Sequence, residues 1–267
     1  MTQLDTSRFG LRWIEHTGGR LTAIECAQLL VAIALGVPKT IVGFLRLEGW
    51  ISSPATAADL SAFEPPRSAF ARHVEQAAAK QPSEMVAHSY RTWLFGRALA
   101  IRDRSGLDPS LFYCAAMLHD LGLVRPTPGT DFTLAGAERA MACAIASGVT
   151  RQSAEAIGDA ICVHPTPGLS IRRDGALGFY LQAGAIADVS GIRLWEMQDS
   201  EVQDILHQHG RGAGFKPMLA EMMRAEAKAV PHGRFALLVR CGGTSAIRSS
   251  IHGVRAESLP DKPSRAH

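Results

Sequence analysis

The segment with the clearest chemical potential is Ala115 to Leu121, AAMLHDL, in which an apolar run ends on adjacent His119 and Asp120. A helix end of this composition is expected to be buried, and burying an aspartate without a partner is costly. A divalent cation would compensate, because histidine and aspartate are both common metal ligands. The pair therefore predicts a metal site.

Three more ligand-type residues are expected to point inward from other helices. His88 shares a helical face with Thr92 and Phe95. Asp188 and His164 each follow small or apolar residues at i−7, i−4 and i−3, which lie on the same helical face. Histidines and carboxylates together suit zinc, iron or manganese. The alternatives are a hydrogen-bonded core histidine for His164, and a buried cap or salt bridge for Asp188.

Helices must position these residues, because the apolar spacing from about residue 67 onward follows the α-helical repeat. We expect helices near 67–80, 84–104, 108–121, 134–147, 151–164, 175–190, 199–208 and 216–229. Asp108-Pro109 offers an N-cap with proline in the first turn. The only candidate strand is Arg234 to Val239, so the predicted fold class is all-α.

The chain divides by composition into an N-terminal extension (1–50), a main helical domain (51–240) and a tail (241–267). The tail is rich in Gly, Ser, Arg and Pro, which predicts disorder. The apolar stretch Leu29 to Leu45 is marginal for a bilayer span, because Pro38, Lys39 and two glycines interrupt it. We expect it to be buried or to face a partner.

The overall composition limits the function classes. The 267 residues are 46% hydrophobic and 20% charged, with a net charge of +3 that is too small to indicate nucleic-acid binding. The five cysteines form no C-x-x-C pair, and the opening segment is polar. These features favour a cytoplasmic protein with free thiols and a small-molecule substrate, and with neither nucleic acid nor membrane as a partner. Homo-oligomer formation is left open.

The order H…HD…D resembles the HD-domain superfamily of metal-dependent hydrolases, with closer similarity to its cyanamide-hydratase-like branch. Five ordered motifs carry the resemblance: AHSYRTWLFG at 87–96, AAMLHDLGL at 115–123, DFTLAGA at 131–137, AICVH at 160–164 and ADVSG at 187–191. The resemblance covers about residues 50 to 230 and implies an HD-domain helical bundle there, between the N-terminal extension and a flexible C-terminal tail. It also implies His88, His119, Asp120 and Asp188 as metal ligands, with His164 close by.

Histidine spacing favours one metal ion over two. Two-metal HD proteins supply further histidines between the HD pair and the last aspartate, whereas here only His164 lies between Asp120 and Asp188. We expect zinc, with iron or manganese as alternatives. The expected catalytic residues are Asp120, His164 and Arg91, although Arg91 could instead form a salt bridge to a carboxylate. Thr133 stands where the branch has an acidic residue and is assigned to the substrate.

Three functions remain in competition. The branch resembled implies a hydrolase or hydratase that acts on a small nitrogen compound, nitrile-like or amide-like. The superfamily at large implies a phosphohydrolase, which the scarcity of Arg and Lys near the ligands disfavours. The third is a non-catalytic binding module stabilised by its metal. The glycine-rich stretch Gly210 to Phe215 lacks dinucleotide-binding spacing and is interpreted as a flexible loop.

Overall fold

The computed structural model describes residues 8–52 and 63–249, and this part of the chain is helical, without a β-strand. The all-α fold class is confirmed. The α-helices are α1 (Leu11–Thr17), α2 (Ala23–Leu47), α3 (Ala69–Ala78), α4 (Ser83–Arg102), α5 (Pro109–Leu118), α6 (Thr133–Ala146), α7 (Arg151–Val163), α8 (Ile171–Ser190), α9 (Asp199–Gln208), α10 (Phe215–Ala229), α11 (Arg234–Arg240) and α12 (Gly243–Ser249).

The eight predicted helices correspond to α3 through α10. The Asp108 side chain accepts from the backbone amides of Ser110 and Leu111, so the predicted N-cap of α5 is confirmed. Helix α8 begins earlier than predicted, at Ile171, because Ser170 caps it, and its backbone departs from helical geometry at Gly175. The boundaries of the others differ from the predictions by a few residues at most, as helix ends commonly do.

The predicted strand at Arg234 to Val239 is wrong, since these residues form α11. A strand needs a neighbour to satisfy its backbone amides and carbonyls. The described residues offer no such neighbour, and a helix satisfies these groups internally. Helix α11 also buries Arg234, Ala236 and Leu237 against the body.

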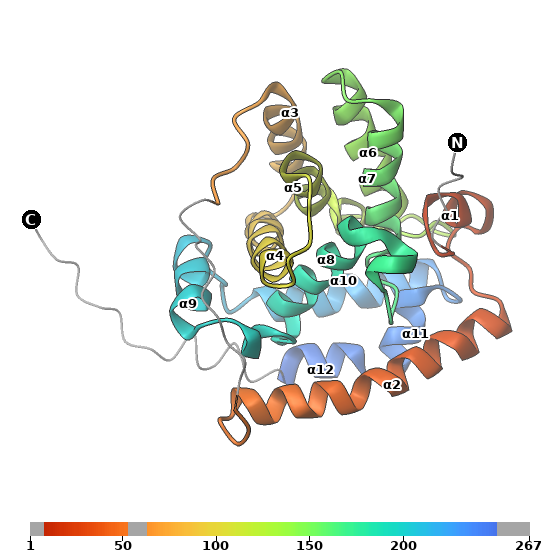
Figure 1. Cartoon of the computed structure of the whole chain (residues 1–267). Helices are drawn as coiled ribbons and strands as arrows, with labels where there is room; N and C mark the ends of the chain where they lie inside the picture. Colours follow the sequence, from red (N-terminus) through yellow and green to blue (C-terminus); the bar gives the residue numbers. More distant parts are fainter. Residues whose placement is uncertain (1–7, 53–62, 250–267) are drawn as a thin grey trace, which may run out of the picture.

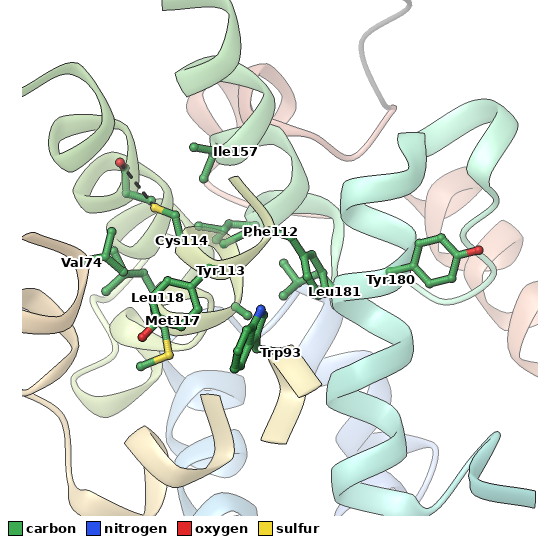
Figure 2. Packing of buried hydrophobic residues seen from close by; sticks show 14 of the residues in the cluster. Val74, Trp93, Phe112, Tyr113, Cys114, Met117, Leu118, Ile157, Tyr180 and Leu181 are labelled. Carbon is green, nitrogen blue, oxygen red and sulfur yellow. Dashed lines mark hydrogen bonds between the residues drawn. The ribbon is translucent and has the colours of Figure 1, made fainter. Parts of the chain in front are cut away.

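Helices α4 and α8 run through the middle of the molecule, with α3, α5, α6 and α7 on one side and α2, α11 and α12 on the other (Figure 1). Figure 2 shows the core on the α5 side, where Trp93 lies near Tyr113 and Leu181. The rings of Trp93 and Tyr113 meet edge to face at 5.2 Å. This packing fixes α4, α5 and α8 relative to one another.

Two glycines let α4 and α8 approach closely. A Cβ atom at Gly184 would lie 2.1 Å from the carbonyl oxygen of Thr92, and one at Gly96 would lie 2.6 Å from the carbonyl oxygen of Tyr180. Larger residues would force the two helices apart. One turn further along, this close approach brings His88 of α4 against Asp188 of α8.

The N-terminal extension contains two helices with different environments. Helix α1 packs on α7, where the backbone amide of Leu11 donates to Asp159, and Leu11 and Ile14 belong to the main core. Helix α2 continues through Pro38 and lies along the edge of the molecule (Figure 1). By length and composition alone, its segment Ala23–Arg46 could cross a membrane. Only 11% of the most apolar part of this segment is buried. Of the two expectations for this apolar stretch, burial is therefore wrong.

The tail assignment needs a correction at its start. Composition predicts disorder from residue 241, yet Gly243–Ser249 form α12, which packs on α10 and buries Thr244 and Ile247. The contact with α10 supplies apolar burial that composition alone does not reveal. Residues 250–267, like residues 53–62, lie outside the described residues.

Candidate metal centre

Three ligand-type side chains converge between α4 and the end of α5. The Nε2 atoms of His88 and His119 lie 3.3 Å apart. Asp120 Oδ2 lies 3.6 Å from the first and 3.3 Å from the second. All three residues are buried. His119 is the C-cap of α5 and Asp120 precedes the short 3-10 helix Leu121–Val124, so the helix end directs both side chains to one point.

Hydrogen bonds orient the imidazole rings so that their Nε2 atoms face the site. Nδ1 of His119 donates to the Ala116 carbonyl at 2.7 Å, and Nδ1 of His164 donates to the Ile161 carbonyl at 2.7 Å. Nδ1 of His88 is 2.6 Å from Asp188 Oδ2. Each Nδ1 thus has an acceptor, which leaves Nε2 as the lone-pair atom of the neutral ring.

This arrangement fits a single divalent metal ion. Two Nε2 lone pairs that face each other at 3.3 Å repel unless a proton or a cation lies between them. With ligand distances of about 2.0–2.2 Å, the donor atoms of a tetrahedral site are about 3.3–3.6 Å apart. The separations among His88, His119 and Asp120 fall in this range. These residues could therefore hold a divalent ion through three donors, and His164 Nε2 lies beside them, 3.5 Å from Asp120 Oδ1.

Asp188 lies on the other side of the His88 ring, outside the three-donor group. Its Oδ1 accepts from Arg91 Nε at 2.7 Å and from Arg211 Nη2 at 2.5 Å, and its Oδ2 accepts from Arg91 Nη2 at 3.0 Å. The structure thus joins three of the four predicted ligands and places the fourth behind His88. For Arg91, it shows the salt bridge rather than a position over the metal.

Burial and neighbouring charges shift the pKa values of three side chains at the site. Burial opposes ionisation of Asp120, but His119, His164 and His88 outweigh it and hold its pKa well below the usual range. Burial likewise disfavours a charged His88, yet Asp120 and Asp188 raise its pKa. Burial lowers the pKa of His164 despite its contact with Asp120. Asp120 is thus an anion beside a neutral His164.

Residues 85–210 match the model of the HD domain family. The match spans every histidine and aspartate of the site and supports membership of that superfamily. HD domains bind divalent metals and are typically metal-dependent hydrolases, in agreement with the donor group found here. A search of curated proteins gave no match.

A loop at the end of the matched region, interpreted from sequence as flexible, contacts the site directly. Arg91 Nη1 donates to the carbonyls of His209 and Gly210, and Arg211 binds Asp188. The Phe215 ring then packs on His88 at 5.2 Å. Sequence reasoning missed Arg211, because an arginine between glycines gives no periodic signal.

Thr133 has a different environment from the one predicted. Its hydroxyl donates to Asp131 Oδ1 at 2.6 Å, and Asp131 Oδ2 pairs with Arg234 at 2.8 Å. Arg234 also donates to the Cys162 carbonyl at 2.6 Å. Thr133 is fully buried in this network and is not among the cavity-lining residues, so the prediction that it binds substrate is not supported.

A cavity of about 530 Å³ opens over the metal donors. His88, His119, Asp120 and His164 form its polar end, and apolar side chains of α2, α8, α10, α11 and α12 form most of its remaining wall. Gln182 lines the cavity and donates through Nε2 to the carbonyls of His164 and Thr166, at 2.7 and 2.6 Å. No Arg or Lys is among the described residues that line it.

Proposed function

We propose that this chain is a metal-dependent hydrolase or hydratase that acts on an uncharged, nitrogen-containing group, nitrile-like or amide-like, attached to an apolar body. The observation that carries this proposal is the absence of Arg and Lys from the described lining of the cavity. Phosphate groups are bound by Arg, Lys or helix N-termini. The nearby Arg91 and Arg211 are bound to Asp188 instead. An uncharged substrate needs no such cation.

The number of protein donors favours catalysis over a purely structural metal. Catalytic zinc sites commonly have three protein ligands and keep a position open, whereas structural sites are closed by four. His88, His119 and Asp120 would hold the ion, with zinc favoured and iron or manganese as alternatives. A divalent ion there would supply Lewis acidity and lower the pKa of a bound water.

His164 has the geometry of a proton-transfer group. Because its Nδ1 donates to the Ile161 carbonyl, its Nε2 is free to accept a proton at the polar end of the cavity. We assign it to accept a proton from the attacking water and to deliver it to the substrate nitrogen. Gln182 would orient the substrate, since two carbonyls hold its amide nitrogen and its Oε1 remains to accept a substrate N–H.

The size and lining of the cavity support an apolar body on the substrate. A volume of about 530 Å³ lies within the range of sites that hold drug-sized ligands, roughly 300–1,000 Å³. A nitrile or amide of a few atoms would leave most of the apolar wall in contact with water. The resemblance to the cyanamide-hydratase-like branch supports the nitrogen-containing group but does not account for this volume.

The test is a substrate panel with zinc-loaded protein. Dodecanenitrile would give dodecanamide by addition of one water, and dodecanamide with a second water would give dodecanoate and ammonium. Mass spectrometry measures dodecanamide and dodecanoate. Acetonitrile and acetamide, which lack a long apolar chain, test whether turnover requires the apolar body. The compound p-nitrophenyl phosphate tests the phosphohydrolase alternative. We expect turnover of a long-chain nitrile or amide that is lost in His119→Ala. Faster turnover of the phosphate ester would overturn the proposal.

A further inference from the structure

Exposed apolar side chains are concentrated on one element. Of the thirteen large hydrophobic residues that are exposed in the described part of the chain, eight lie on α2, and two of these eight line the cavity over the metal donors. Ile24 is 69% exposed, Val31 58% and Leu35 70%. Contiguous exposed apolar surface on a folded protein marks an interaction site. Helix α2 is therefore the strongest candidate for a docking surface.

The two faces of α2 have different environments. At 100° per residue, Ile33, Gly36 and Thr40 share one face, and these residues line the cavity over the metal donors. Val31, Leu35 and Val42 share the opposite face with Ile24, and they are exposed. Helix α2 is thus a wall of the cavity on its inner side and an apolar surface on its outer side.

Both ends of α2 are fixed to the body. Near its start, Leu29 is buried with Phe9 and Leu237, and Glu25 accepts from Trp13 Nε1. Near its end, Gly43 packs so closely on Trp195 that a Cβ there would lie 2.2 Å from the ring. The helix spans the side of the molecule beside α11 and α12 (Figure 1). Its outer face is consequently held in place on the molecular surface.

The charges of α2 favour one class of partner for its outer face. The exposed Lys39 and the half-buried Arg46 lie seven residues apart on one edge of the apolar face. The only acidic residue of the helix, Glu25, is buried and bonded to Thr22 and Trp13. A second copy would bring like charges together, whereas an anionic lipid surface complements them. Trp50, 79% exposed just beyond the helix, is a residue type that prefers membrane interfaces.

We propose that the outer face of α2 docks on an anionic lipid surface. An apolar helix face bordered by cations inserts at the boundary between headgroups and acyl chains, and its affinity combines apolar burial with attraction to anionic lipids. This proposal departs from the expectation of no membrane partner. Docking would place α2, which is a wall of the cavity, against the lipid. If the proposed function holds, on which this step rests, the substrate is a nitrile or amide dissolved in the membrane.

Flotation of the full chain with lipid vesicles tests the docking without any need for activity. We expect binding to phosphatidylcholine vesicles that contain phosphatidylglycerol, weaker binding without it, and release at high salt. Leu35→Glu should reduce the bound fraction about tenfold or more. The matched control is Ile145→Glu on α6, where Ile145 is 49% exposed, and it should bind like the parent chain.

Other occupants of this face give different results, and each would overturn the proposal. A dimer in solution that Leu35→Glu dissociates, without vesicle binding, identifies a second copy as the partner. Resistance of the bound protein to alkaline carbonate identifies a membrane-spanning helix. Equal loss of binding in Ile145→Glu would show that a negative charge added anywhere on the surface weakens vesicle binding, so that the effect is not specific to α2. Failure of the proposed reaction leaves vesicle binding intact, so the two proposals can be judged separately.

Discussion

Asp188 Oδ2 lies 2.6 Å from Nδ1 of His88, while Nε2 of the same ring faces His119 at 3.3 Å. One imidazole thus connects the donor group to a carboxylate that two arginines hold in place. Carboxylates behind a ligand histidine fix the orientation of its ring and raise its basicity. Asp188 is thus placed to orient the His88 ring.

Asp188→Asn should weaken zinc binding by about 10- to 100-fold without abolishing it, because an amide can still accept from Nδ1 but carries no charge. Competition with a chromophoric chelator measures the affinity, and circular dichroism verifies folding. Asp199→Asn, at an exposed position on α9, is the control. Complete loss of zinc from a folded Asp188→Asn protein would restore Asp188 as a direct ligand, as the sequence predicted.

His119→Ala and Asp120→Ala should each lose stoichiometric metal, activity and the stability that the metal confers. The reason is that each removes one of three donors, and a ligand that binds only the folded state stabilises it by mass action. Metal analysis of the purified proteins and melting curves with and without chelator measure both effects. His207→Ala, exposed on α9, should match the parent protein. Full metal occupancy in both variants would place the site elsewhere.

His164→Ala should keep its metal content near normal and lower turnover by about 100- to 10,000-fold, the usual contribution of a general acid or base. The motivation is that His164 Nε2 lies beside Asp120 but outside the three-donor group. Metal content and rate are measured on one preparation. Loss of metal would make His164 a ligand and revive a two-metal site, and an unchanged rate would make it an ordinary core histidine.

Glu226→Gln should change how stability depends on pH. Burial, assisted by the charge of Asp131, raises the pKa of Glu226 to about 7 from its ordinary value of 4.5. The folded state therefore holds this proton more tightly than the unfolded state. The stabilisation of the folded state by protonated Glu226 is fully present below pH 4.5 and is lost as the pH rises through about 7.

Melting temperatures of the parent and Glu226→Gln at pH 5 and pH 8 measure this effect. A glutamine side chain cannot ionise. The melting temperature of the variant, relative to that of the parent, should therefore rise by about 2–4 °C from pH 5 to pH 8, which corresponds to about 1 kcal/mol in a chain of this size. Glu138→Gln, exposed on α6, is the control. A parallel pH profile for Glu226→Gln and the parent would show that Glu226 is ionised in the folded protein throughout.

The sequence by itself determined the helical fold and the candidate metal-binding pair. Apolar residues at helical spacing must be buried on one face, so the eight central helices could be located from the sequence. An adjacent His119 and Asp120 at an apolar helix end require a compensating charge, which made the pair visible without any coordinates. The strand predicted at Arg234 to Val239 failed because a short apolar run has no clear period, and only its neighbours decide its backbone conformation.

Tertiary structure alone decided what surrounds that pair. The position of Asp188 behind His88 depends on the close crossing of α4 and α8 at Gly96 and Gly184, which periodicity does not specify. Arg211 reaches Asp188 from a loop, and the cavity-lining residues of α2 come from a distant, earlier part of the chain. Spacing along one helix fixes which face a side chain occupies. The partner it meets depends on how separate helices pack, because that contact joins residues far apart in the chain.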